Sequence, residues 1–413
     1  MVLVLRRVAS GRKVSRKPGE IIGNSRWIAG FLALPAVFAG GPAARTPVPQ
    51  AQTPPAFTIA SRIRVAESPG AVAVVDVNGD GMLDAIVASE RDHSLTVLLG
   101  DGTGRFVEAP GSPVAAGNAP NDVAIGRFNA DPIPDVAIAN HEAHYITVLL
   151  GDGRGGFRPA PRSPVSVAVK PHPHGIAAAD FDGDGNLDLV VDGWETDEVE
   201  VLRGDGGGHF SAHATLRVGR HPYQRVRAWD ANGDGHADVV TANLRGASVT
   251  ILAGDGRGGF RPARGSPFAA NPFPTAVATG DFDRNGYADL AVTNSPSNSA
   301  GQGRDGLTLL LSDGAGGFRA VGSGPLATGA APTQLAVADF DGDGRDEAAV
   351  SNMNSGTITV ARLAKEGRLE VTGSLRVGRQ PKGIATGDLD RDGKPDLVIA
   401  NNGDDDVWIA LVN

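Results

Sequence analysis

The stretch DFDGDGNLD, residues 180–188, decides the fold of this chain because related nonapeptides recur along nearly its whole length. The other six begin at positions 76, 127, 230, 281, 339 and 388 and read DVNGDGMLD, RFNADPIPD, DANGDGHAD, DFDRNGYAD, DFDGDGRDE and DLDRDGKPD. Successive starts are separated by 51, 53, 50, 51, 58 and 49 residues. A period of this length indicates a repeat architecture with one supersecondary unit per repeat.

Short apolar runs surround each nonapeptide and predict strands. One run precedes it, as VAVV does at 72–75, and a second follows it, as AIVAS does at 85–89. A third run, such as LTVLLG at 95–100, ends in a glycine-rich turn whose Phe opens a fourth, less regular strand. Runs of Val, Ile, Leu and Ala are expected to be buried on both faces. Four strands in about 50 residues are typical of a propeller blade, so we predict an all-β, seven-bladed propeller.

The two ends of the repeat region predict how the ring closes. The seventh repeat stops after its third strand, VWIALVN at 407–413, and lacks a fourth. Residues 56 to about 68 resemble that missing strand, because Phe57 lies 19 residues before Asp76 just as Leu369 lies 19 before Asp388. We therefore expect the N-terminal strand to complete the last blade, which also protects the open sheet edges. A linear solenoid is the alternative.

Residues 1–55 differ from the repeats and are interpreted as a signal peptide and a Pro-rich linker. A basic segment precedes the 15-residue apolar run WIAGFLALPAVFAGG, residues 27–41. This run is short for a membrane span but suits a secretory signal, with small residues at Ala43 and Ala44 as a cleavage site. An uncleaved anchor or a misplaced start codon is the alternative. We expect a secreted, periplasmic or cell-surface protein whose residues 56–413 form the propeller.

Composition restricts the classes of partner and chemistry. The net charge of −9 becomes about −16 when residues 1–51, with eight Lys or Arg and one Glu, are removed. Such an acidic chain is a poor nucleic-acid binder. Because there is no Cys, disulfides and thiol chemistry are excluded. We expect a monomer with no membrane contact after signal cleavage, and the high Arg, Gly and Ala usage favours a bacterial source.

Six of the nonapeptides have the oxygen ligands that Ca²⁺ requires. Asp or Asn stands at positions 1, 3 and 5, a backbone carbonyl is available at position 7, and a carboxylate stands at position 9. An EF-hand is excluded because position 12 falls inside a strand, and Mg²⁺ is less suited because it retains its waters. Plain acidic turns are the alternative. The predicted ligands, with the carbonyl donor fourth in each set, are Asp76, Asn78, Asp80, Met82 and Asp84; Asp180, Asp182, Asp184, Asn186 and Asp188; Asp230, Asn232, Asp234, His236 and Asp238; Asp281, Asp283, Asn285, Tyr287 and Asp289; Asp339, Asp341, Asp343, Arg345 and Glu347; and Asp388, Asp390, Asp392, Lys394 and Asp396.

The second nonapeptide, residues 127–135, is the exception and is predicted to bind no metal. Arg127 replaces the first carboxylate, and Pro132 replaces the glycine at position 6. Arg127 either pairs with Asp131 or Asp135 in place of a cation or is simply exposed. Among the other six, Glu347 departs mildly because its side chain is longer than that of Asp.

The seven motif copies resemble the FG-GAP or VCBS repeat proteins, whose propeller is also that of the integrin α-subunit head. The resemblance covers residues 56 to 413. It implies calcium in the hairpin loops between the first and second strands of the blades. It also implies an extracellular binding or adhesion role, but family resemblance indicates fold more strongly than function.

The face opposite the acidic loops is where we expect a ligand. It should present Tyr145, His172, His174, Trp194, Tyr223 and Phe273 together with the longest loop, residues 294–306. The pairs His141 with His144 and His172 with His174 resemble transition-metal ligands, but their spacing indicates no third or fourth ligand. We therefore interpret them as surface histidines.

No catalytic pattern is visible in the sequence. We find no nucleophile elbow and no Ser, His and Asp spacing typical of nucleophilic catalysis, and the GDG turns join strands, so they do not open a helix as phosphate loops do. The preferred interpretation is a noncatalytic calcium-binding module for an extracellular protein or glycan. A propeller lectin and a polysaccharide lyase-like enzyme are the alternatives.

Overall fold

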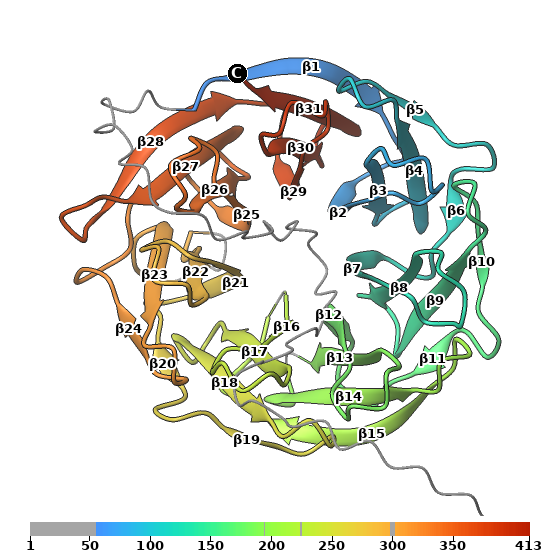
Figure 1. Cartoon of the computed structure of the whole chain (residues 1–413), viewed down its shortest axis with the longest axis horizontal. Helices are drawn as coiled ribbons and strands as arrows, with labels where there is room; N and C mark the ends of the chain where they lie inside the picture. Colours follow the sequence, from blue (N-terminus) through green and yellow to red (C-terminus); the bar gives the residue numbers. More distant parts are fainter. Residues whose placement is uncertain (1–54, 194, 224, 298–301) are drawn as a thin grey trace, which may run out of the picture.

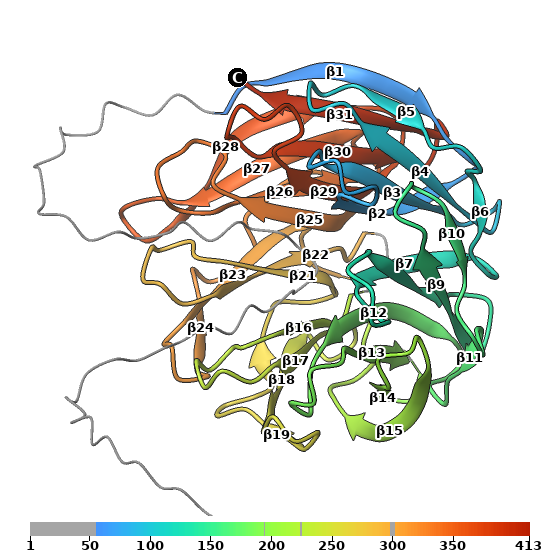
Figure 2. The ribbon, with the colours of Figure 1, turned by 45° about the vertical axis from the view of Figure 1, so that its right-hand side comes forward.

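The computed structural model describes residues 55–193, 195–223, 225–297 and 302–413 and confirms the predicted fold. Seven antiparallel sheets stand around a common axis like the blades of a propeller (Figure 1), and the rotated view in Figure 2 shows the same ring. The described residues contain no helix, so none of them forms a helix able to cross a membrane. The signal peptide and linker, except Pro55, lie outside these residues.

Each blade is a meander whose first strand lies at the axis and whose last strand lies at the rim. The strands of blades 1 to 3 are β2 (Pro69–Val75), β3 (Asp84–Ser89), β4 (Ser94–Gly100), β5 (Phe106–Glu108) and β6 (Val114–Ala115); β7 (Pro120–Gly126), β8 (Asp135–Asn140), β9 (Tyr145–Gly151), β10 (Phe157–Pro159) and β11 (Val165–Ser166); and β12 (Pro173–Ala179), β13 (Asp188–Gly193), β14 (Glu198–Gly204) and β15 (Phe210–Arg217).

The strands of blades 4 to 7 follow the same order. They are β16 (Arg227–Trp229), β17 (Asp238–Asn243), β18 (Ser248–Gly254), β19 (Phe260–Pro262) and β20 (Phe268–Ala269); β21 (Pro274–Gly280), β22 (Asp289–Asn294), β23 (Gly306–Ser312) and β24 (Phe318–Ala320); β25 (Pro332–Ala338), β26 (Glu347–Asn352), β27 (Thr357–Leu363) and β28 (Leu369–Arg376); and β29 (Pro381–Gly387), β30 (Asp396–Asn401) and β31 (Asp406–Val412).

The N-terminal strand closes the ring as predicted. β1 (Phe57–Arg64) pairs antiparallel with β31, with Phe57 opposite Val412, and the last sheet has the order β1-β31-β30-β29. Figure 1 shows β1 on the rim beside the C-terminus. The last blade therefore combines the first and last strands of the chain, and a linear solenoid is excluded.

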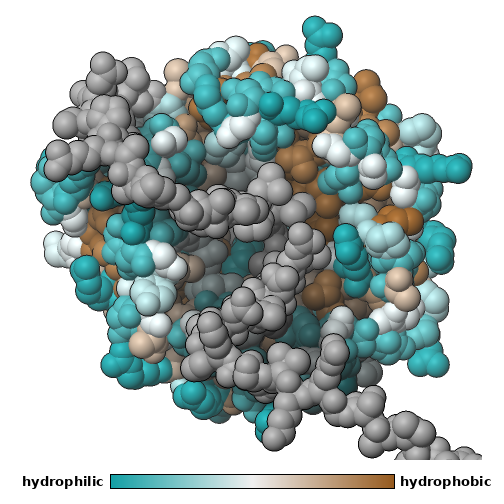
Figure 3. Space-filling view, in the orientation of Figure 1, coloured by the Kyte–Doolittle hydropathy of each residue, from teal (hydrophilic) through white to brown (hydrophobic). Residues whose placement is uncertain are grey.

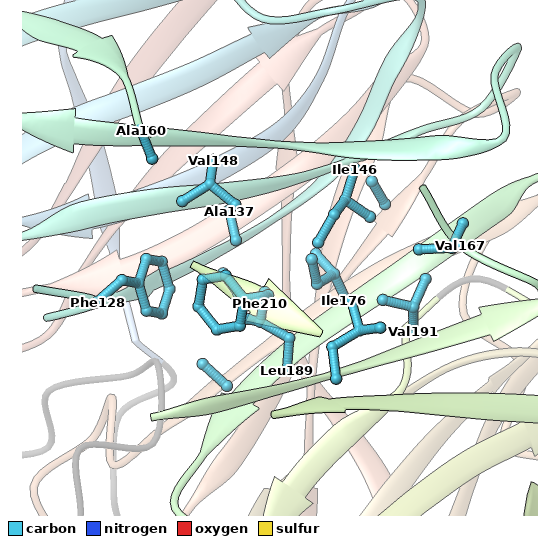
Figure 4. Close-up of a cluster of buried hydrophobic side chains, with 14 of the residues drawn as sticks. Phe128, Ala137, Ile146, Val148, Ala160, Val167, Ile176, Leu189, Val191 and Phe210 are labelled. Atoms are coloured by element: carbon cyan, nitrogen blue, oxygen red, sulfur yellow. The ribbon is translucent and has the colours of Figure 1, made fainter. Parts of the chain in front are cut away.

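The core consists of apolar side chains packed between neighbouring blades. All six residues of the second strand are buried in every blade, as the apolar runs predict for strands covered on both faces. Figure 4 shows one such cluster, in which Ile146 of blade 2 belongs with Leu189 of blade 3. Phe128 and Phe210 add an edge-to-face ring contact at 5.4 Å between centroids. Each such side chain contributes roughly 1.5–3 kcal/mol by leaving water, so blade contacts stabilise the ring.

The topology divides the loops between the two faces of the disc. The nonapeptides connect the first strand of each blade to the second, and the GDG turns connect the third to the fourth. Because neighbouring strands are antiparallel, both sets of loops lie on one face, and the second-to-third strand loops and the connections between blades lie on the other. We call these the acidic face and the connection face.

Candidate functional site

The six complete nonapeptides share one hydrogen-bonded turn. In each of them the glycine N–H at position 6 donates to a carboxylate oxygen of the position-1 Asp, as Gly185 does to Asp180 at 3.0 Å. Gly185 has φ +89°, a conformation that residues with a side chain rarely adopt. Asp182 and Asp184 in turn accept N–H groups two residues further on. These bonds wind the backbone around a single point.

Carboxylate oxygens converge at that point in four of the loops. In three of these the oxygens of positions 1, 3 and 9 lie within 4.8 Å of one another, and in the fourth position 5 joins them. The sets are Asp180, Asp182 and Asp188; Asp281, Asp283 and Asp289; Asp388, Asp390 and Asp396; and Asp339, Asp341, Asp343 and Glu347. The loops starting at Asp76 and Asp230 carry Asn at position 3. Such clusters offer the hard oxygen ligands of a divalent cation.

Position 9 holds the blade together as well as facing the cluster. Asp188 is 2% exposed and accepts the N–H of Phe181 through one oxygen, at 3.0 Å, and that of Gly204 through the other, at 2.9 Å. The Asp residues of five other blades make the equivalent pair of bonds. This carboxylate therefore joins the start of the loop to the end of the third strand, a role that the sequence analysis missed.

Burial makes it unfavourable for these carboxylates to carry their negative charge. Desolvation, with nearby carboxylates adding to it, raises the pKa of Asp84, Asp188, Asp289 and Asp396 to about 6, of Asp238 to about 7 and of Glu347 to about 8. Among the described residues, Glu347 Oε1 and Asp388 Oδ1 are buried and have no hydrogen-bond partner. A buried oxygen without a donor is costly, and a bound cation would satisfy both atoms. The residues therefore fit a cation.

Two arginines modify the clusters in a way that the nonapeptides alone did not indicate. Arg203, at the end of β14, lies 2.7 Å from Asp182 and 3.0 Å from Asp184. Arg362, in β27, lies 3.2 Å from Asp341. Both arginines come from the third strand of the blade, about 20 residues after the acids that they contact. They place a positive charge beside two of the predicted calcium loops.

Replacing Arg203 with Leu, the residue found at the equivalent positions 99 and 150, should strengthen calcium binding at residues 180–188 about fivefold, because a competing positive charge is removed. Isothermal titration calorimetry of the wild type and the variant measures this change. The control is Arg154→Leu, which alters an exposed arginine of a GDG turn. Equal affinities in Arg203→Leu and wild type would show that Arg203 does not compete with calcium.

The exceptional second loop keeps its turn but not its first carboxylate. Asp131 still accepts the N–H of Ile133, and Asp135 still accepts those of Phe128 and Gly151. Arg127 is exposed, and the described residues make no ion pair with it, so the second of the two alternatives, a simply exposed arginine, is the one that the structure shows.

On the connection face, a polar cleft of about 320 Å³ lies between the first and last blades. Its lining residues are Ser68, Arg91, Arg379, Gln380, Asn402, Gly403 and Asp405. The Arg379 guanidinium lies 2.5 Å from Asp404, which orients it. The local sequence pattern does not reveal this cleft, because its two walls come from opposite ends of the repeat region.

A small cavity lies among the inner strands of the blades. The cavity beside Arg225, Arg227 and Gln334 measures only about 10 Å³, which is about the space of one water. The guanidinium of Arg225, in blade 4, forms a buried ion pair with Asp122 of blade 2. Figure 3 shows hydrophilic and hydrophobic surface around the central hollow of the molecule.

Three histidines come together on the connection face, contrary to the prediction of surface histidines. His174 is only 3% exposed, and its ring lies 4.3 Å from that of His141 and 4.9 Å from that of His172, between centroids. One ring nitrogen from each of the three lies within 4.8 Å of the other two. Burial, with the neighbouring histidines adding to it, lowers the pKa of His174 to about 2 and of His172 to about 4. His144 is exposed and is not part of this group.

The other residues predicted for this face lie in different surroundings. Tyr223 packs against His174, with ring centroids 5.0 Å apart. The Tyr145 hydroxyl accepts the N–H of Asn118 at 3.2 Å. Phe273 is half-buried and has φ +54°. Trp194 and residues 298–301 of the longest loop lie outside the described residues.

Comparison with known proteins supports the repeat assignment. A family model described as FG-GAP-like repeat matches residues 76–138, 127–191, 230–292 and 298–350, which together make up more than half of the chain. No curated protein matches the sequence significantly.

Solved structures share the fold at low sequence identity. BBS1N, solved in complex with ARL6DN, has a TM-score of 0.58 and 13% identity over 88% of this chain and 98% of that chain. A protein from Lactobacillus plantarum has a TM-score of 0.54 and 18% identity over 76% and 85%. Virginiamycin B lyase from Staphylococcus aureus has a TM-score of 0.53 and 12% identity over 87% and 100%. These likenesses show the propeller fold, and the matched repeats show that the chain belongs to the FG-GAP-like repeat family.

Proposed function

We propose that this protein is an exported, noncatalytic binding module whose acidic loops hold about six calcium ions and whose connection face binds an extracellular protein or glycan. The observation that carries the calcium part is the convergence of carboxylates at positions 1, 3 and 9 within 4.8 Å. The two buried oxygens without a donor, Glu347 Oε1 and Asp388 Oδ1, point to the same conclusion. Bound Ca²⁺ would supply positive charge and coordination that rigidify the hairpin loops.

The ligand positions of an acidic loop have different roles. The position-1 and position-3 carboxylates shape the turn by accepting backbone N–H groups and keep further lone pairs for the cation. The position-9 carboxylate faces the same cluster from the blade core, where it is held by two N–H donors. The backbone carbonyl at position 7 would complete the ligand set. Residues 127–135 lack the first of these groups and are proposed to stay empty.

The polar cleft between blades 1 and 7 is the proposed ligand site. Arg91 and Arg379 are exposed there, and guanidinium groups recognise carboxylate or sulfate groups bidentately. The amides of Gln380 and Asn402 add hydrogen-bond donors and acceptors. An acidic peptide or an acidic glycan of an extracellular partner suits this lining.

Counting bound calcium tests the metal part of this proposal. Purified chain dialysed against buffered Ca²⁺ should carry about six ions by mass spectrometry, and Asp388→Ala should carry one fewer because the first ligand of the last loop is lost. Asp131→Ala is the control, since it alters the loop predicted to be empty and should leave the count unchanged. A wild-type chain that carries no calcium would refute the metal assignment, and a count of seven would refute the empty loop.

Binding to arrays of acidic glycans and extracellular matrix proteins tests the module role. The calcium-loaded chain should bind at least one immobilised member, and the double variant Arg91→Ala/Arg379→Ala should lose that binding. Arg154→Ala/Arg257→Ala is the matched control, because it removes two exposed arginines from the acidic face. Unchanged binding by the cleft variant would exclude this cleft, and breakdown of a polysaccharide during the assay would refute the noncatalytic role.

A further inference from the structure

The three clustered histidines belong to two different blades that the ring brings together. His141 follows β8 at the end of the second strand of blade 2, and His172 and His174 stand at the start of β12, the inner strand of blade 3. The centroid of the His141 ring lies 4.3 Å from the ring centroids of His172 and His174. Three nitrogen atoms, one from each ring, lie within 4.8 Å of one another. A small movement of the rings would bring the three nitrogens around a single ion.

The backbone of His174 is fixed by buried polar groups. Its N–H donates to Asp192 at 3.2 Å, and its carbonyl accepts the Asn121 side chain at 2.9 Å. Asp192 and Asn121 are themselves buried, at 1% and 6% exposure. These bonds fix the backbone from which the ring projects, and the burial of His174 restricts the ring itself, which lowers the entropy cost of binding.

A carboxylate from a third blade stands behind His141. Glu90, which follows β3 of blade 1, has one oxygen 3.7 Å from Nδ1 of His141. Its other oxygen accepts a hydrogen bond from Lys382 of blade 7 at 2.7 Å. An outer carboxylate orients a metal-bound histidine and increases its basicity by accepting the N–H of its far nitrogen. At 3.7 Å this hydrogen bond is not formed in the structure, and we expect it to form when His141 binds the ion.

We propose that His141, His172 and His174 form a binding site for a divalent transition-metal ion, with Glu90 as the residue that positions His141. Three imidazoles suit borderline ions such as Zn²⁺, Co²⁺ or Cu²⁺, whereas calcium prefers oxygen ligands. Three protein ligands leave the fourth tetrahedral position of Zn²⁺ open for water or an exogenous donor. The site lies on the connection face, separate from the acidic loops, and does not depend on the proposed function.

Zinc binding by the full-length, calcium-saturated chain tests this site. The wild type should bind one Zn²⁺ per chain in competition with a colorimetric zinc chelator, and Co²⁺ should give the visible absorption of a tetrahedral nitrogen-ligated ion. His172→Ala and His141→Ala should lose this binding and this absorption. Glu90→Gln should retain one site with affinity reduced about tenfold, as expected when an outer carboxylate is removed. Excess Ca²⁺ keeps Zn²⁺ from the acidic loops.

His144→Ala is the matched control, because His144 lies three residues from His141 and is exposed. It should bind Zn²⁺ and Co²⁺ like the wild type. His141 and His172 are both partly exposed, so circular dichroism should show that their Ala variants are folded. Histidine ring ¹⁵N resonances of the wild type give a readout that needs no variant, since three rings should shift on adding one equivalent of Zn²⁺. The absence of stoichiometric binding to the wild type, or equal loss in His144→Ala, would overturn the proposal.

Discussion

Removing calcium with EGTA should lower the unfolding temperature of the purified chain by about 20 °C. A site occupied at 100 times its dissociation constant stabilises the folded state by about 2.7 kcal/mol. The stabilisation free energy of six such sites, divided by the unfolding entropy expected for a propeller of this size, gives a shift in unfolding temperature of that order. The physical cause is the repulsion among converging carboxylates, such as Asp180, Asp182 and Asp188, once the cation is gone.

Differential scanning calorimetry in Ca²⁺, in EGTA, and in EGTA followed by excess Ca²⁺ measures this effect. The third sample should regain the original unfolding temperature, and Mg²⁺ in place of Ca²⁺ should restore little of it because Mg²⁺ retains its waters. Identical transitions with and without EGTA would mean that the acidic loops are stable turns without metal.

Replacing Asp135 with Ala should destabilise the protein by about 3 kcal/mol in the presence and in the absence of calcium. Asp135 is fully buried in the loop that is proposed to be empty, and it accepts the N–H groups of Phe128 at 2.8 Å and Gly151 at 2.9 Å. Its loss leaves two buried donors unsatisfied, at roughly 1–3 kcal/mol each, and adjustment of the loop recovers part of this. The effect is independent of calcium because no first-position carboxylate is present beside it.

Urea unfolding of Asp135→Ala and wild type measures the difference in their free energies of unfolding, once with Ca²⁺ and once with EGTA. The two differences should be equal. Asp135→Asn should cost less, because its amide oxygen still accepts one of the two N–H groups. Asp131→Ala provides a control in the same loop, since Asp131 is only half-buried and accepts one N–H, that of Ile133. A cost for Asp135→Ala that appears only with Ca²⁺ would show that this loop binds metal after all.

The features that the sequence predicted correctly are those encoded within one repeat or by comparing repeats. The seven nonapeptides predict seven blades, and the resemblance of residues around Phe57 to those around Leu369 predicts the strand that completes the last blade. Both features follow from the local spacing of motifs and from the pattern of apolar residues. The buried second strands follow from the same patterns, because runs such as AIVAS contain few polar residues.

The features that were missed depend on contacts between blades or between strands of one blade. Arg203 contacts acids that precede it by 19 to 21 residues, and such a contact requires the register of β13 with β14. The histidine group requires the packing of blade 2 against blade 3. Thirty residues lie between His141 and His172, and no regular sequence pattern links the two positions. The structural role of Asp188 was hidden because an acidic side chain at position 9 suggests only metal binding, whereas its burial shows a backbone acceptor.

The pairing of Phe57 with Val412 has a consequence for the order in which the protein folds. The outer strand of the last blade is synthesised first, and the strand on which it must pair is synthesised last. Until β31 has been synthesised, β1 has no partner, and the face of blade 1 that packs against blade 7 is uncovered. The ring therefore closes only at the end of synthesis, and a premature stop before β31 leaves β1 with an open edge able to pair with another chain.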